Sequence, residues 1–137
     1  MNEAEHILET RRWLKYAGED LHTAQVIISE PTIACRHVCW LAQQSAEKSI
    51  KAILIFLQID YHRTHDLDAL RNLVPDGWPV KAKFPDLAIL TEWAVEARYP
   101  GNWQEASLSD AQFTLKQAGD IFDTVLSDFM IRGLKIA

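Results

Sequence analysis

Three short segments of this 137-residue chain carry side chains that could bind phosphate or a nucleotide. The first runs from Gln43 to Ala52, with the sequence QQSAEKSIKA. Successive residues of a helix turn by about 100°. On a helix through this segment, one arc therefore holds four polar side chains: Gln44, Glu47, Lys48 and Lys51. Because the apolar residues fall on the opposite side, the segment predicts one helix with a core face and an ordered polar stripe.

The polar stripe (Gln44, Glu47, Lys48 and Lys51) has more than one interpretation. As a solvated face it needs only an i,i+4 pair between Glu47 and Lys51, worth about 0.2–0.5 kcal/mol. Trp40 and Ile55, however, lie in the same angular sector, one turn beyond each end. Apolar residues that flank a polar row are typical of a covered surface. The residues expected to line a subunit interface or a ligand groove are therefore Trp40, Gln44, Glu47 and Ile55.

The second segment runs from Tyr61 to Asp66 and contains Arg63 between two histidines. A helix that starts here would offer free N–H groups, and His65 could bind a phosphate beside them. The structural alternative is that His65 holds the helix start by hydrogen bonding. A metal site of His62, His65 and Asp66 is disfavoured, because three residues in one loop are weak evidence for coordination.

The third segment is Arg98-Tyr99-Pro100. A guanidinium recognises phosphate through paired hydrogen bonds, and a tyrosine ring can stack on a base. Alternatively, this segment only ends a helix, where a basic residue suits the helix dipole. In the functional interpretation, Arg98 and Tyr99 form the wall opposite the polar stripe. The candidate nucleotide- and phosphate-binding residues are then Lys48, Lys51, His65, Arg98 and Tyr99.

Other common chemistries leave no trace in the sequence. It contains no glycine-rich phosphate loop, serine nucleophile elbow or zinc-hydrolase helix. Cys35 and Cys39 are expected to be buried free thiols, because two cysteines alone build neither a disulfide scaffold nor a metal site. The net charge of −5 gives no general attraction for nucleic acid, so contact with RNA would be confined to a site. We therefore predict no metal, no cofactor and no catalytic residue.

Helical periodicity extends over nearly the whole chain, and no segment predicts a strand. Long helices are expected at about residues 3–29 and 32–57, the second being central because its inner face is the most apolar. Further helices are expected from an N-cap at Thr64, from Pro85, and from Ser109 in a capping box with Gln112. Residues 75–79 predict a loop. The fold class is therefore all-α: an up-and-down antiparallel bundle of four to five helices in a single domain, residues 1–137.

The sequence also bears on location. Residues 1–6 are polar and acidic, unlike the start of a signal peptide. No apolar run approaches the roughly 20 residues that span a bilayer. We therefore expect a cytoplasmic protein with no membrane partner.

The segments Gln43–Ala52, Thr64–Leu67 and Arg98–Pro100, in this order and spacing, resemble the HEPN domain family. The stretch from Trp13 to Leu21, with the sequence WLKYAGEDL, resembles the usual start of the family's first helix. Each motif is short, but the four together are fairly specific, and the resemblance covers residues 12–129. It implies an all-α bundle of four to five helices that is commonly a homodimer.

The resemblance also implies several classes of function. HEPN proteins are often encoded beside a minimal nucleotidyltransferase and associate with it, frequently as a toxin–antitoxin pair. Other members are metal-independent ribonucleases, whose signature is an arginine followed after four to six residues by a histidine. Counted from Arg98, the positions for that histidine hold Trp103, Gln104 and Glu105. All five histidines precede Arg98, so the chain lacks this ribonuclease motif.

We therefore expect a non-enzymatic HEPN-like module that binds the phosphate of a nucleotide or RNA. Its expected protein partners are a second copy of the chain and a nucleotidyltransferase. One alternative is a metal-independent ribonuclease toxin that uses Arg98 with His65 or Tyr99. Another is a dimerising scaffold without ligand, in which the polar stripe is only an interface.

Overall fold

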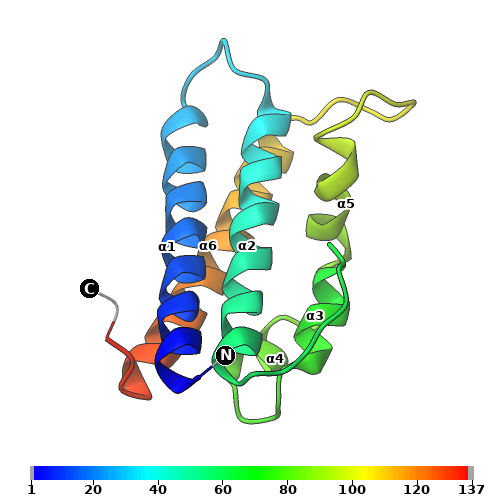
Figure 1. The fold of residues 1–137 in the computed structure, drawn as a ribbon. Helices are drawn as coiled ribbons and strands as arrows, with labels where there is room; N and C mark the ends of the chain where they lie inside the picture. Colours follow the sequence, from blue (N-terminus) through cyan, green and yellow to red (C-terminus); the bar gives the residue numbers. More distant parts are fainter. Residues whose placement is uncertain (1, 136–137) are drawn as a thin grey trace.

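The computed structural model describes residues 2–135, and over that range it contains helices and no strand. The helices are α1 Glu3–Ile27, α2 Cys35–Phe56, α3 Leu67–Leu73, α4 Pro79–Lys83, α5 Ala88–Glu96 and α6 Leu108–Ile131 (Figure 1). The predicted all-α fold class is confirmed, with α4 as a short helix that was not expected. None of the helices in this range is long and apolar enough to cross a membrane.

Helix α2 lies at the centre of the bundle, as its apolar inner face predicts. It packs against α1, α3, α5 and α6. In Figure 1, α1 and α5 run upward and α2 and α6 run downward, which gives the up-and-down topology. Helix α6 lies behind α1 and α2, and α5 lies on the side of α2 away from α1. Side chains on α2 can therefore meet side chains from almost every other element.

The apolar residues that repeat at helical spacing along the sequence form the core. The buried residues of the two outer long helices include Leu14, Ala17, Leu21 and Ala24 on α1 and Ala111, Ala118, Val125 and Phe129 on α6. Small side chains let α1 and α2 approach closely, and the Ser45 hydroxyl donates a hydrogen bond to the Ala17 carbonyl at 2.8 Å. This contact fixes the position of α2 along α1.

An aromatic cluster joins α2, α4 and α6. Phe129 is fully buried, and its ring meets those of Phe56 and Trp78 edge-on at centroid separations of 5.2 and 5.4 Å. The Arg132 guanidinium lies 3.7 Å from the centroid of Trp78 and covers the cluster. Edge-to-face aromatic pairs add stabilisation beyond the area that they bury. The cluster therefore anchors the end of α6.

Two helix starts differ from the expectation, one because of a local cap and the other because of a tertiary contact. Helix α3 begins after Asp66 rather than after Thr64, since the Asp66 carboxylate accepts a hydrogen bond from an N–H of the first turn. Helix α5 begins three residues beyond Pro85. The Leu87 N–H just before it donates to the Asp68 carboxylate of α3 at 2.9 Å. That contact is invisible to local sequence patterns.

Two further differences concern α4 and α6. Residues 75–79 are not wholly a loop, because Pro79 starts α4, where its fixed backbone angle suits the first helical position. The capping box of α6 is formed by Ser107 and Asp110, and the predicted pair of Ser109 and Gln112 is wrong. Ser107 and Asp110 each satisfy a backbone N–H of the other, at 3.1 and 2.9 Å. An acidic third position also suits the helix dipole.

We expect Phe129→Ala to lower the free energy of unfolding by about 3–5 kcal/mol, because it leaves a cavity in the aromatic cluster. Urea unfolding followed by circular dichroism measures the change. Phe113→Ala is the matched control, since Phe113 lies on the same helix but is 53% exposed. Its effect should stay within about 0.5 kcal/mol. Equal effects of the two substitutions would contradict the described core.

Candidate functional site

The buried carboxylate of Glu47 organises the polar stripe. Glu47 lies midway along α2, and its side chain is 6% exposed. Its carboxylate accepts hydrogen bonds from Gln43 Nε2 at 3.1 Å and from Lys51 Nζ at 3.0 Å, and it lies 2.8 Å from His65 Nδ1. His65 precedes α3, whereas the other partners belong to α2. The carboxylate therefore ties α2 to the segment that leads into α3.

Two opposing effects set the pKa of Glu47. Burial is the largest single effect, and it raises the pKa because it disfavours the ionised form. The hydrogen bonds from His65, Gln43 and Lys51 together outweigh burial, so the pKa lies below its ordinary value of 4.5. Glu47 is therefore ionised at neutral pH and provides the counter-charge for Lys51.

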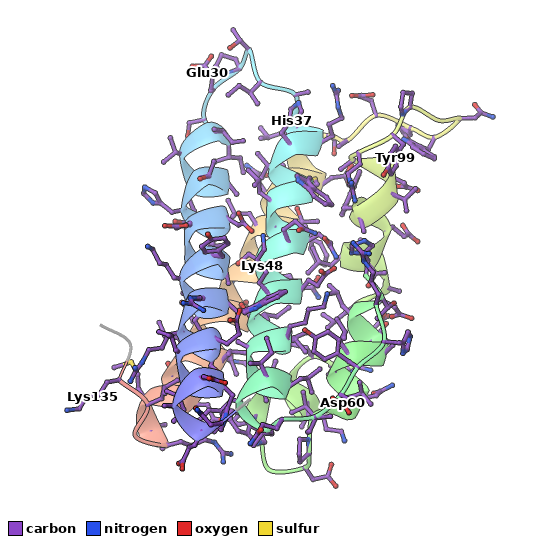
Figure 2. The ribbon with its side chains drawn as sticks, in the orientation of Figure 1. Glu30, His37, Lys48, Asp60, Tyr99 and Lys135 are labelled. Carbon is purple, nitrogen blue, oxygen red and sulfur yellow. The ribbon has the colours of Figure 1, made fainter. Side chains whose placement is uncertain are left out.

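Both lysines of the polar stripe are compensated inside the chain. Lys51 pairs with the buried carboxylate, and its ammonium lies 5.8 and 5.4 Å from the ring centroids of Trp13 and Tyr61. Lys48, midway along α2 in Figure 2, forms an ion pair with Asp20 of α1. The polar stripe is therefore not a solvated face, because neighbouring elements of the same chain cover most of it.

Arg98 is held by aromatic rings instead of carboxylates. It follows the end of α5 and is exposed. Its guanidinium carbon lies 4.7 Å from the ring centroid of Trp40 on α2 and 5.1 Å from that of Tyr99. Figure 2 shows Tyr99 at the same end of the bundle as His37, which marks the start of α2. Within residues 2–135, no ion pair involves Arg98.

A cavity of about 380 Å³ opens beside Arg98. The end of α5 and the following loop through Trp103 and Glu105 line it, together with Arg36 of α2. Arg36 Nη1 donates to Glu105 Oε1 at 2.9 Å, in a pair whose side chains are 43% and 73% exposed. The cavity thus contains two guanidinium groups, of which Arg98 has no carboxylate partner in the described part of the chain.

The structure distributes the predicted residues over separate places. Arg98 and Tyr99 line the cavity described above, whereas Lys48 lines another cavity of about 280 Å³ with Trp13 and Tyr16 of α1. Ile55 lines a third, of about 420 Å³. None of the residues Lys48, Lys51 and His65 lines the cavity of Arg98 and Tyr99. Side chains of α1 and of the segment before α3 contact the two lysines instead.

The predicted interface or groove residues also differ in their surroundings. Trp40 is half-buried beneath the Arg98 guanidinium, and Ile55 is half-buried. Gln44 is half-buried and donates a hydrogen bond to the side chain of Gln43 at 2.7 Å. Glu47 is buried inside the chain. Of these four residues, those that present surface to another molecule are therefore Trp40, Gln44 and Ile55.

Arg98 and His65 are not brought together. Arg98 stacks on Trp40, whereas His65 contacts Glu47, seven positions further along α2. Seven residues of helix correspond to about 10 Å along its axis. No hydrogen bond or ion pair within residues 2–135 joins Arg98 to a histidine. A shared Arg98–His65 site within one chain therefore has no support in the contacts.

Sequence reasoning missed Arg36 and Trp103 as residues of this cavity. In the sequence, Trp103 was noted only because the ribonuclease motif would require a histidine at or near this position. Arg36 lies 62 positions before Arg98, and no spacing rule connects the two. What brings them together is the packing of α2 against α5. The one available signal was the presence of Tyr99 and Trp103 within five residues of Arg98.

The two thiols are free, Cys39 buried and Cys35 half-buried. Burial raises the pKa of Cys39 to about 11, because an apolar environment disfavours the thiolate. In the part of the chain that the structure describes, no three His, Cys, Asp or Glu side chains group as potential metal ligands. Cys39 is therefore an unreactive thiol at neutral pH.

Comparisons with known proteins identify the family. The model of the HEPN domain matches residues 10–128. A Methanocaldococcus jannaschii protein, "Putative toxin MJ1304", is 29% identical over 140 residues, covering 91% of this chain and 90% of that protein. The crystal structure of ST0689, an archaeal HEPN homologue, superposes with a TM-score of 0.64 at 25% identity, covering 87% of this chain and 96% of that chain. The chain belongs to the HEPN domain family, and the resemblance seen in its sequence is confirmed.

We expect Glu47→Gln to lower the free energy of unfolding at pH 7 by about 3 kcal/mol, because it leaves the buried Lys51 ammonium without a counter-charge. Urea unfolding measures the loss. The matched control is Asp120→Asn, which removes the acid of an exposed i,i+4 pair with Lys116. That pair should contribute only about 0.3–0.5 kcal/mol.

The effect of Glu47→Gln should also depend on pH. Because the folded pKa of Glu47 lies below 4.5, its carboxylate stabilises the fold fully above that pH. This contribution is lost as the pH falls through the folded pKa. The stability difference between wild type and variant should therefore shrink below pH 4.5 in the same urea series. A difference that stays constant from neutral to strongly acidic pH would refute the ionised carboxylate.

Proposed function

We propose that this HEPN domain is a toxin-type binding module that holds a phosphate group of a nucleotide or RNA against Arg98. One observation carries the proposal: Arg98 is an exposed guanidinium stacked on Trp40 and Tyr99, beside a cavity. Contact with a ring leaves the N–H groups of the guanidinium free to donate. A phosphate can accept two parallel hydrogen bonds from such groups.

The size and lining of the cavity support this assignment. A volume of about 380 Å³ is near the lower end of ordinary small-molecule sites, which span about 300–1,000 Å³. Arg36 supplies a second guanidinium in the same cavity, and Tyr99 and Trp103 supply aromatic surface. A cation with adjacent rings suits a ligand that joins a phosphate to a base.

Two acids moderate the positive charge of the cavity. Glu105 holds Arg36 in an exposed pair, which a phosphate can displace at small cost. Glu96 also lines the cavity, and burial, followed by repulsion from Glu92 and Asp110, raises its pKa. Arg98 therefore makes the first contact with a phosphate in our proposal, and Arg36 contributes once Glu105 is displaced.

We assign a framework role to the other predicted cations. Lys48 and Lys51 are paired with Asp20 and Glu47, and His65 lies against the Glu47 carboxylate. Recruiting either lysine to a phosphate would leave a carboxylate unpaired. Their contribution to binding is therefore indirect, through the position of α2.

We propose further that the module pairs with a second copy of itself and with a minimal nucleotidyltransferase, as a toxin–antitoxin system. The toxin name of the Methanocaldococcus jannaschii relative supports the toxin role. The half-buried residues Trp40, Gln44 and Ile55 on α2 offer an interface surface. Co-purification of the chain with the product of a neighbouring nucleotidyltransferase gene tests this pairing.

The contacts favour a module that binds a nucleotide or RNA without cleaving it. Metal-free cleavage of RNA needs groups that move the 2′-hydroxyl proton, and histidine suits this near neutral pH. His65 is engaged by Glu47, two helical turns from the ring that holds Arg98. Cleavage of RNA by the purified chain in EDTA, abolished by Arg98→Ala, would establish the ribonuclease alternative instead.

We expect Arg98→Ala to weaken the binding of AMP and of ribose 5-phosphate about tenfold or more, because charge-assisted hydrogen bonds to phosphate are lost. Isothermal titration calorimetry with each probe measures the change. Arg98→Lys should give an intermediate affinity, since it keeps the charge but loses the planar fork. Arg63→Ala, at an exposed position before α3, is the matched control and should change nothing. Unaltered binding by Arg98→Ala would overturn the assignment.

We expect Glu105→Gln to tighten the binding of both probes by up to about fivefold, because it frees the Arg36 guanidinium from an exposed ion pair. The same calorimetric titration measures the gain. Glu19→Gln, at an exposed position on α1, makes the same change of charge away from the cavity. If both variants tighten binding equally, only the net charge matters, and Arg36 has no part in the site.

A further inference from the structure

We propose that Trp103 is the base-stacking wall of the cavity and that Gly101 positions its ring. The proposal rests on the function proposed above, since it concerns the same cavity. It assigns to Trp103 the stacking role that the sequence analysis gave to Tyr99. It also makes Gly101, in the loop after α5, a determinant of ligand preference.

Tyr99 is poorly suited to stack on a base. The Arg98 guanidinium lies 5.1 Å from its ring centroid, so one face of the ring is already in use. Trp40 is engaged by the same guanidinium at 4.7 Å. Among the cation–π contacts of residues 2–135, none involves Trp103. Its indole therefore lies against the Gly101 backbone without a cation on its ring.

Trp103 is placed and exposed as a stacking residue requires. It lines the cavity together with Arg98, and it is 37% exposed, so part of its ring is covered and part is accessible. A ring that is already held in place loses little freedom when a ligand stacks on it. Stacking on tryptophan tolerates any base, because every base has a π-face.

Gly101 is what allows the Trp103 ring to lie where it does. A methyl group at position 101 would fall 2.3, 2.4 and 2.7 Å from three carbons of the indole's six-membered ring. Such distances are far below van der Waals contact, so a side chain at this position must displace the ring. Because Trp103 is partly exposed, the ring can move without unfolding the bundle. Gly101 is therefore a positioning residue that acts through Trp103.

The arrangement divides recognition between two groups. Arg98 binds the phosphate, and Trp103 binds the base on the same ligand. The wild-type chain should therefore prefer AMP to ribose 5-phosphate, which has the same phosphate and sugar but no base. The preference should fall when Trp103 is removed or displaced, whereas the affinity for ribose 5-phosphate should not.

Calorimetric titration of wild type and variants with AMP and ribose 5-phosphate tests the proposal. Trp103→Ala should weaken AMP binding about fivefold or more and leave ribose 5-phosphate unchanged, and Trp103→Phe should restore most of the AMP affinity. Gly101→Ala should reproduce the effect of Trp103→Ala. Gly119→Ala is the control, because a methyl group there meets no heavy atom within 4 Å.

The double variant of Gly101→Ala and Trp103→Ala separates positioning from a direct role. If Gly101 acts through Trp103, the double variant binds AMP as weakly as Trp103→Ala alone. Additive losses would overturn the positioning role. Equal affinity of the wild type for AMP and ribose 5-phosphate would overturn the stacking role and leave the phosphate site intact. Failure of the wild type to bind either probe would overturn the proposed function itself.

Discussion

The buried carboxylate of Glu47 is the constraint on which the rest of the structure depends. An ionised acid in a bundle core is costly unless hydrogen bonds and a counter-charge compensate it. Gln43 and Lys51 supply part of that compensation from α2, but the contact with His65 comes from outside the helix. Satisfying the carboxylate therefore fixes the segment before α3, and with it the side of α2 on which α3 and α5 pack.

This constraint also separates the framework charges from the charge available to a ligand. Midway along α2, each lysine of the polar stripe has an acid of its own chain as partner. At the end of α5, Arg98 has aromatic partners instead. A ring stabilises a cation without consuming its hydrogen-bond donors, whereas a carboxylate consumes them. A positive charge is thus structural at one level of the bundle and, in our proposal, available to a ligand at another.

Helical periodicity predicted the bundle because the core residues repeat regularly on α1, α2 and α6. The starts of α3 and α6 were misplaced because a neighbouring residue, Asp66 or Ser107, provides the local cap. The start of α5 depends on the tertiary hydrogen bond from Leu87 to Asp68, which local patterns do not show. In the candidate site, the sequence predicted Arg98 and Tyr99 from their chemistry, and both line one cavity. It could not identify Arg36, because only the packing of α2 on α5 brings that residue near.

The same reasoning applies to the polar stripe. Angular sorting on one helix shows which residues share a face, but not which element covers that face. Here α1 covers it with Asp20 and Trp13, and the segment after α2 covers it with Tyr61. These side chains contact the lysines that seemed free in the sequence. A lysine pattern indicates a binding surface only when the chain supplies no partner for it. Arg98 has no carboxylate partner within residues 2–135, and this is why our proposal places the phosphate there and not on the stripe.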